Sequence, residues 1–272
     1  MSKKPKKAKK QKLADQYDKH VLYQDAVQCV EAELDFVDIT FKSLRGRNAH
    51  LLREDFCGTA NTSSEWVRRR RKNQAVAVDL DEAVLEWGRE HNVTSLSKGQ
   101  QSRITLLNHN VMNVKSDPMD VILAMNFSYW IFNERATLKQ YFKSVHRSLN
   151  DEGVFYMDCY GGYDAFREMK ERRDCDYFTY IWDQEYYDPI SGAYVCHIHF
   201  KFPDGSQMKK AFSYHWRLWT LPEIREILKE AGFSNVSVFW QEAAEDDEED
   251  DFRIREHGDA DAGWISYIVA EK

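Results

Sequence analysis

The apolar residues of this chain recur in two rhythms, and each rhythm predicts a different kind of element. Up to residue 45, apolar positions follow helical spacing, first within residues 13–29 and again within residues 31–44. Two amphipathic helices are therefore expected before the first strand. Beyond residue 46, short apolar runs alternate with helical patterns, as in βα units that build a parallel sheet. The five strands predicted from these runs are residues 50–56, 75–80, 103–111, 119–125 and 153–160.

The pattern changes after residue 176, where aromatic residues alternate with polar ones. Three such segments, within residues 177–219, are separated by the turn sequences Asp-Pro-Ile-Ser-Gly and Pro-Asp-Gly. We interpret residues 176–219 as an antiparallel β insertion. A helix that begins at Thr220 and two further strands complete the chain. The predicted fold class is α/β: a seven-stranded, doubly wound, Rossmann-like sheet with an antiparallel last strand, and with the insertion between the fifth strand and its following helix.

Charge is unevenly distributed along the chain. Residues 1–12 hold seven lysines and no acidic residue, which predicts a disordered tail. Contact between this tail and an anionic partner such as RNA is the alternative to a purely solubilising role.

The rest of the chain divides into two regions. Residues 13–45 hold the N-terminal helices, and residues 46–272 form the main domain. The net charge is −7, and residues 242–262 predict an acidic loop, because eight of the first ten residues in it are carboxylates.

Neither a membrane segment nor a metal centre is expected from the sequence. No apolar run approaches the ~18 residues of a spanning helix, and no apolar segment follows the lysine-rich N-terminus. The five cysteines are scattered without a Cys-x-x-Cys pair, which disfavours both a disulfide framework and a zinc site. These features predict a soluble, cytoplasmic protein with reduced cysteines.

The loop after the first predicted strand carries the first candidate chemistry. It reads Arg-Glu-Asp-Phe-Cys-Gly-Thr-Ala from Arg53 to Ala60, with small residues where backbone can approach a ligand closely. Asp79 lies at the end of the next strand, where a carboxylate can accept hydrogen bonds from the hydroxyls of a ribose. Ligands of open parallel sheets bind at the carboxyl ends of the strands. Because the loop has neither a Gly-x-Gly-x-x-Gly pattern nor a P-loop ending, an adenosine ligand without a pyrophosphate fits best.

These residues resemble the class I S-adenosylmethionine-dependent methyltransferases, whose first motif ends in the form acidic-x-x-Cys-Gly-Thr-Gly. The stretch from Glu54 to Ala60 follows that form, with Phe56 and Ala60 where two of the glycines often stand. The resemblance covers residues 48–162 by motif and residues 220–272 by layout. Leu-Arg-Glu-Asp-Phe-Cys-Gly-Thr-Ala looks characteristic of one subgroup. The cofactor that this resemblance implies is S-adenosyl-L-methionine.

The family pattern also implies roles for individual residues. Glu54 and the backbone around Gly58 would contact the amino-acid end of the cofactor, and Asp79 would bind the ribose. Arg53 could pair with the cofactor carboxylate, and a salt bridge elsewhere is the alternative. The candidate cofactor-binding residues are Arg53, Glu54, Cys57, Gly58, Thr59, Asp79, Leu80, Asn110, Val111 and Asn126, of which Leu80, Asn110 and Val111 would surround the adenine.

Methyl transfer from a sulfonium is an in-line displacement with a neutral leaving group, so the enzyme mainly has to position the acceptor. The resemblance places the segment after the fourth strand, which begins at Asn126, beside the transferred methyl group. Asn126 and Tyr129 are its candidate catalytic residues. His215 is the candidate for a pocket base, because it stands next to Trp216 in the aromatic insertion.

The aromatic residues of the insertion suit a cationic or planar small molecule, if they cover the acceptor. The same rings could instead pack the insertion onto the main domain or onto a second subunit, so a homodimer stays open. The predicted function is S-adenosylmethionine-dependent methyl transfer to a small molecule. Two alternatives remain: methyl transfer to a protein or RNA side group, and a non-catalytic module that binds S-adenosylmethionine.

Overall fold

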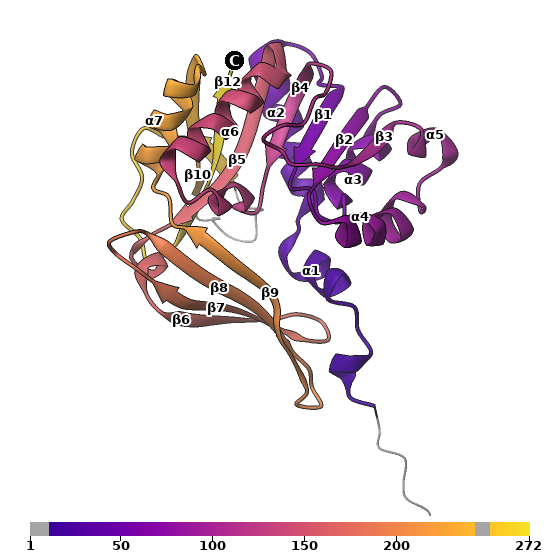
Figure 1. Ribbon diagram of the computed structural model, residues 1–272, viewed down its shortest axis with the longest axis vertical. Coiled ribbons are helices and arrows are strands. Elements are labelled where there is room, and N and C mark those ends of the chain that lie inside the picture. Colours follow the sequence, from indigo (N-terminus) through magenta and orange to yellow (C-terminus); the bar gives the residue numbers. More distant parts are fainter. Residues whose placement is uncertain (1–10, 243–250) are drawn as a thin grey trace, which may run out of the picture.

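The computed structural model of the protein describes residues 11–242 and 251–272, and its centre is one large sheet (Figure 1). The strand order is β11-β10-β12-β5-β4-β1-β2-β3. The strands of this main sheet are β1 (Leu51–Asp55), β2 (Gln74–Asp79), β3 (Ile104–Asn108), β4 (Met119–Ala124), β5 (Leu149–Gly161), β10 (Asn235–Glu242), β11 (Asp251–Ile254) and β12 (Trp264–Glu271). β1 to β5 pair in parallel, and β12 is antiparallel to both of its neighbours. The predicted doubly wound α/β sheet with a reversed last strand is confirmed.

Helices cover both faces of the main sheet because each presents an apolar stripe to it. On one face, α2 (Val30–Arg45) and α3 (Asn61–Arg69) contribute to a core that includes Trp66. On the other face, α6 (Arg135–Ser148) and α7 (Leu221–Ala231) pack against the largest core cluster. The remaining helical elements are α1 (Lys19–Val27), α4 (Glu82–Gly88), α5 (Lys98–Gln101), a π-helical turn (Arg89–Val93) and 3-10 turns at Leu13–Asp15, Ser128–Ile131 and Tyr163–Phe166.

The predicted insertion is a separate antiparallel sheet between β5 and α7, in the order β6-β7-β8-β9. Its strands are β6 (Met169–Asp174), β7 (Thr179–Tyr187), β8 (Ala193–Lys201) and β9 (Gln207–Arg217). This insert sheet lies at the same end of the main sheet as α1, which packs against it (Figure 1). Three strands were predicted and four are present. The prediction missed β6 because this strand is almost wholly exposed and therefore lacks the alternation of apolar residues that identifies a strand.

The main sheet has eight strands where seven were predicted, and the additional one lies within the predicted acidic loop. Residues 251–254 form β11, which pairs with β10 at the edge of the sheet. The loop prediction for residues 242–262 is therefore wrong at this strand, which is only four residues long and follows directly on the acidic run. Most of the acidic run and of the lysine-rich tail falls in residues 243–250 and 1–10, outside the described residues. Within the described part of the chain, no helix is long and apolar enough to span a bilayer.

Candidate active site

The loop between β1 and α3 is held in an unusual backbone conformation. Phe56, Gly58 and Ala60 all have positive φ angles, of 59°, 51° and 54°. For residues with a Cβ atom this left-handed region costs roughly 1–2 kcal/mol, and such strain concentrates at functional sites. The ring of Phe56 packs against those of Phe132 and Tyr141, with centroid distances of 6.0 and 5.7 Å. The loop thus keeps a backbone shape that glycine usually permits, although Phe56 and Ala60 carry side chains.

Asp79 lies where the sequence predicts it, at the carboxyl end of β2 and beside this loop. One carboxylate oxygen accepts the backbone N–H of Gly58 at 2.8 Å, and the other accepts the backbone N–H of Asp81 at 2.9 Å. The next residue, Leu80, is 69% exposed. Asn110 is also exposed, and Val111 is buried in the core, so Val111 can offer a ligand only its backbone. The apolar side chain of Leu80, the amide of Asn110 and the carboxylate of Asp79 therefore all lie at the carboxyl ends of β2 and β3.

Arg53 and Glu54 face opposite sides of β1, because successive side chains of a strand alternate. Arg53 is completely buried and forms an ion pair with Asp55, with 2.9 Å between Nε and a carboxylate oxygen. Its guanidinium is thus held by the alternative salt bridge, and we leave it out of the proposed cofactor site. Glu54 accepts hydrogen bonds from the amide and hydroxyl of Ser63, at 2.9 and 2.5 Å. Burial raises the pKa of Glu54 to about 7.

Cys57 and Thr59 contribute to the loop in different ways. The Cys57 thiol is buried, and burial raises its pKa well above the usual value, so it is neither a thiolate nor a nucleophile. The Thr59 hydroxyl accepts a hydrogen bond from Gln24 of α1 at 2.8 Å, and the Thr59 carbonyl accepts one from Asn92, also at 2.8 Å. Thr59 thus joins the loop to the N-terminal helix.

The segment after β4 forms the opposite side of the candidate site. Asn126 and Phe127 have positive φ angles of 58° and 57°. Their backbone N–H groups donate to the two carboxylate oxygens of Asp158, at 2.7 and 2.8 Å. Burial raises the pKa of Asp158 to about 7. Asp158 on β5 therefore fixes the loop in which Asn126 is half-buried at the carboxyl edge of the sheet.

Two predicted catalytic residues do not face this site. Tyr129 is completely buried in the core, its hydroxyl donates to the Asp158 carbonyl at 2.8 Å, and burial raises its pKa well above the usual value. His215 is exposed on β9, on the face opposite Tyr214 and Trp216, because strand side chains alternate. We therefore correct both assignments: Tyr129 packs the core, and His215 lies on the outer face of the insert sheet.

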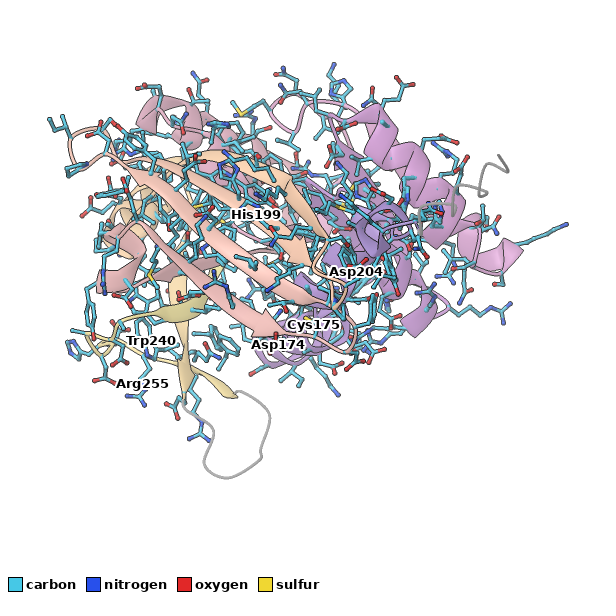
Figure 2. The ribbon with its side chains drawn as sticks, turned by 90° about the horizontal axis from the view of Figure 1, so that it is seen from below. Asp174, Cys175, His199, Asp204, Trp240 and Arg255 are labelled. Atoms are coloured by element: carbon cyan, nitrogen blue, oxygen red, sulfur yellow. The ribbon has the colours of Figure 1, made fainter. Side chains whose placement is uncertain are left out.

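That outer face carries the polar side chains of the insert, as Figure 2 shows for His199 in a view from the side on which the insert lies. The His199 ring lies 3.0 Å from a carboxylate oxygen of Asp183. His197 lies close to Glu185 in the same way. No set of three or more histidine, cysteine or acidic side chains is placed to hold a metal ion within residues 11–242 and 251–272.

The inner face of the insert is aromatic and meets the loop after β4. The ring of Phe127 lies 4.6 Å from Tyr160 and 6.4 Å from Trp216, centroid to centroid. Trp216 stacks on Tyr214 at 4.4 Å and lies 6.2 Å from Trp182. We call Phe127, Tyr160, Trp182, Tyr214 and Trp216 the ring cluster. It places aromatic faces against Phe127, which follows Asn126 in the loop after β4.

Sequence reasoning missed one buried acidic side chain near the candidate site, that of Glu33 on α2. Glu33 lies in the apolar stripe of α2 with Leu34, Val37 and Phe41, and only 9% of it is exposed. Its Oε2 atom has no hydrogen-bond partner in the described part of the chain. Burial, together with the negative charges of Asp158 and Glu54, raises the pKa of Glu33 to about 8. A carboxylate at a core-facing helical position was the signal available from the sequence.

The three raised carboxyl pKa values predict how stability depends on pH. Glu33, Glu54 and Asp158 are more easily protonated when folded than when unfolded, so their contribution is complete below about pH 4 and is lost as pH rises through about 8. The melting temperature of the unliganded protein should therefore fall as pH rises from about 4.5 to about 8. Glu33→Gln should flatten this slope. An equally steep slope in that variant would contradict the assignment.

Gly88 allows α4 to lie against the loop after β1. A Cβ atom at this position would be 2.3 Å from the carbonyl oxygen of Thr59, which is backbone and cannot rotate away. Gly88→Ala should therefore destabilise the protein by about 1–3 kcal/mol in urea unfolding. Gly99→Ala is the matched control, because an added Cβ at Gly99 meets nothing within 4 Å. Equal stability of the two variants would show that α4 does not constrain the loop.

The comparisons with known proteins agree with this geometry. The overall fold is that of S-adenosylmethionine-dependent methyltransferases. Residues 55–157, which include most of the candidate site, match the family model described as a methyltransferase domain. No curated relative matches the chain at the sequence level.

Three solved structures illustrate the likeness in fold. An S-adenosylmethionine-dependent methyltransferase from Clostridium acetobutylicum is 17% identical, with a TM-score of 0.67 over 93% of this chain and 96% of that one. The S-adenosylmethionine-bound amino pentose methyltransferase from Micromonospora echinaspora is 11% identical, with a TM-score of 0.65 over 93% and 95%. A sugar N-methyltransferase from a Streptoalloteichus species is 13% identical, with a TM-score of 0.63 over 100% and 98%.

Proposed function

We propose that this protein is an S-adenosylmethionine-dependent methyltransferase that acts on a small-molecule acceptor. The observation that carries the proposal is the contact between Asp79 and the strained loop after β1. There a carboxylate at the end of β2 and a backbone turn at the end of β1 meet at 2.8 Å. This is the place where an open parallel sheet binds its ligand.

The residues around this contact fit the cofactor. Asp79 would accept the ribose hydroxyls, the backbone from Cys57 to Thr59 would lie along the methionine portion, and Leu80, Asn110 and the backbone of Val111 would surround the adenine. The fit extends to charge, because S-adenosylmethionine carries a sulfonium and an ammonium group. The buried carboxyls of Glu54 and Asp158 have raised pKa values, so a nearby cation would stabilise their ionised forms.

The cofactor supplies a methyl group on a positively charged sulfur. The protein then has to hold the lone pair of the acceptor in line with that methyl group, and good positioning accounts for up to roughly 7–11 kcal/mol of the barrier in intramolecular models. Asp158 fixes Asn126 and Phe127 through their backbone N–H groups. The ring cluster excludes water on the same side, so the loop and the insert together define the acceptor position.

A small molecule is the acceptor that the insert favours. Part of the insert shares the largest core cluster with the main sheet, through Tyr194, Cys196 and Trp216, so the insert is packed over this end of the domain. Two of the proteins with a similar fold are described as an amino pentose methyltransferase and a sugar N-methyltransferase, and amino pentoses and sugars are small molecules.

Methyl transfer from labelled S-adenosylmethionine in a cell extract tests this function. The label is expected in the low-molecular-mass fraction, with one S-adenosylhomocysteine formed for each methyl group transferred. Label in protein or RNA instead would contradict the small-molecule acceptor and leave the reaction type standing. Cofactor binding without transfer to any fraction would identify a non-catalytic binding module.

A further inference from the structure

We propose that the methyl acceptor is an amine and that Glu33 removes the proton from its nitrogen. The inference rests on the proposed function and specifies the acceptor class and the proton acceptor. It starts from Glu33, which lies outside the segment that matches the methyltransferase domain. Its side chain is nine-tenths buried, with a carboxylate oxygen that has no hydrogen-bond partner in the described part of the chain.

The other two buried carboxylates at this site are already engaged. Glu54 accepts two hydrogen bonds from Ser63 at the start of α3. Asp158 uses both oxygens to hold the backbone of Asn126 and Phe127. Glu33 is close enough to both for their charges to raise its pKa. The unpartnered Oε2 atom of Glu33 can accept a hydrogen bond from a ligand, and the surrounding negative charge favours a cation.

The groups that act on Glu33 come from three elements. Asp158 lies on β5 and Glu54 on β1, while Tyr23 on α1 is close enough to feel the charge of Glu33. The Tyr23 ring lies 4.9 Å from Phe212, on the same face of β9 as Tyr214 and Trp216 of the ring cluster. Aromatic faces attract ammonium groups, with energies of about 0.5–2 kcal/mol depending on desolvation. Tyr23 thus links the carboxyl of Glu33 to the aromatic face of β9. This combination of negative charge and rings suits an ammonium group and gives a neutral hydroxyl no comparable gain.

The chemistry of an amine acceptor requires a proton acceptor such as Glu33. At neutral pH the ligand arrives as R–NH3+ and has no free lone pair. The bound ammonium group favours the ionised form of Glu33, whose own proton leaves to solvent on binding. One proton then passes from the nitrogen to a carboxylate oxygen of Glu33, which leaves R–NH2. The nitrogen lone pair forms the N–C bond to the methyl group while the C–S bond breaks and its electron pair stays on sulfur. The products are R–NH2+–CH3 and a neutral thioether, and Glu33 returns its proton to solvent afterwards.

The environment of Glu33 favours this transfer. Burial raises the pKa of Glu33 to about 8, which brings it closer to that of an ordinary amine than an exposed carboxyl group would be. Proton transfer is most effective when the two pKa values approach each other and the operating pH.

The position of the transferred methyl group tests the acceptor class directly. The wild-type protein is incubated with a metabolite extract and S-adenosylmethionine that carries a 13C methyl group, and the product is examined by carbon NMR. Methyl carbons bound to nitrogen and to oxygen give separate resonances. An N-methyl product is expected. An O-methyl or C-methyl product would overturn this inference and leave the proposed function intact, whereas the absence of any product would contradict both.

The role of Glu33 is tested by Glu33→Gln, with Glu31→Gln as the matched control on the exposed side of the same helical turn. With the acceptor found by NMR, Glu33→Gln should lower kcat at pH 7 by about 100-fold or more. The loss should shrink as pH rises, because more of the amine is then already unprotonated. Affinity for S-adenosylhomocysteine should stay within about threefold in both variants. A purely structural role would instead give a loss that does not depend on pH.

A binding measurement gives a readout that does not depend on turnover. Benzylamine and benzyl alcohol are titrated into the complex with S-adenosylhomocysteine, in two buffers that differ in ionisation enthalpy. Benzylamine should bind more tightly than the alcohol and release protons near pH 7.5, because the bound ammonium lowers the pKa of Glu33. The release should disappear in Glu33→Gln and persist in Glu31→Gln. Equal binding of the two probes, or unchanged release in Glu33→Gln, would overturn the inference.

Discussion

Asp79→Ala is expected to lower the affinity for S-adenosylmethionine by about 100-fold or more. The variant loses two hydrogen bonds to a carboxylate, each worth about 1.5–3 kcal/mol, and every 1.4 kcal/mol corresponds to a factor of ten. It also frees the backbone N–H of Gly58, which Asp79 holds at 2.8 Å. Isothermal calorimetry with S-adenosylmethionine measures the effect.

Glu82→Ala is the matched control for this prediction. Glu82 is an exposed carboxylate in the first turn of α4, three residues from Asp79. Its removal changes the local charge by the same amount and should leave the affinity within about twofold. If Asp79→Ala folds normally and binds the cofactor as tightly as the wild type, the cofactor does not contact this carboxylate.

Trp216→Ala should destabilise the protein by about 3–5 kcal/mol, as large-to-small changes of buried tryptophan do. Trp216 is buried where the insert meets the main domain, and its ring lies 5.8 Å from Trp130, 6.2 Å from Trp182 and 6.4 Å from Phe127. Its loss opens the ring cluster beside Asn126, so turnover should fall as well. Urea unfolding measures the stability.

His215→Ala is the control next to it on β9. His215 is exposed on the opposite face of the insert, so its replacement should change stability by less than about 0.5 kcal/mol and leave turnover unchanged. A large loss of activity in this variant would restore His215 as a catalytic base. A neutral Trp216→Ala would show that the insert does not depend on these rings for its position.

The sequence predicted the main sheet well because its central strands are buried on both faces. A continuous apolar run such as residues 121–124 belongs in a core, and the alternation of such runs with helices leaves few possible topologies. The strands β6 and β11 lie at sheet edges and escaped prediction for different reasons. β6 is polar and almost wholly exposed, so its side chains carry no pattern of burial. β11 has only four residues, too few for its alternation of polar and apolar side chains to identify a strand.

The candidate site was predictable in the part that is contiguous in sequence. The loop from Arg53 to Ala60 and the carboxylate of Asp79 follow the strands that position them. Strand alternation could have excluded two assignments from the start, because Arg53 cannot face the same side as Glu54, and His215 cannot share a face with Trp216. The helical pattern indicates that Glu33 faces the core, but its nearness to Asp158 and Glu54 could not be predicted in this way, since it depends on how α2 packs against the sheet.

The structure of the protein with S-adenosylhomocysteine bound tests the central claim most directly. We predict that the ribose hydroxyls lie within hydrogen-bond distance of Asp79 and that the adenine lies beside Leu80 and Asn110. The sulfur should face Asn126 on the loop that Asp158 holds. A nucleoside bound elsewhere, with Asp79 still in contact only with the backbone of Gly58 and Asp81, would contradict the account.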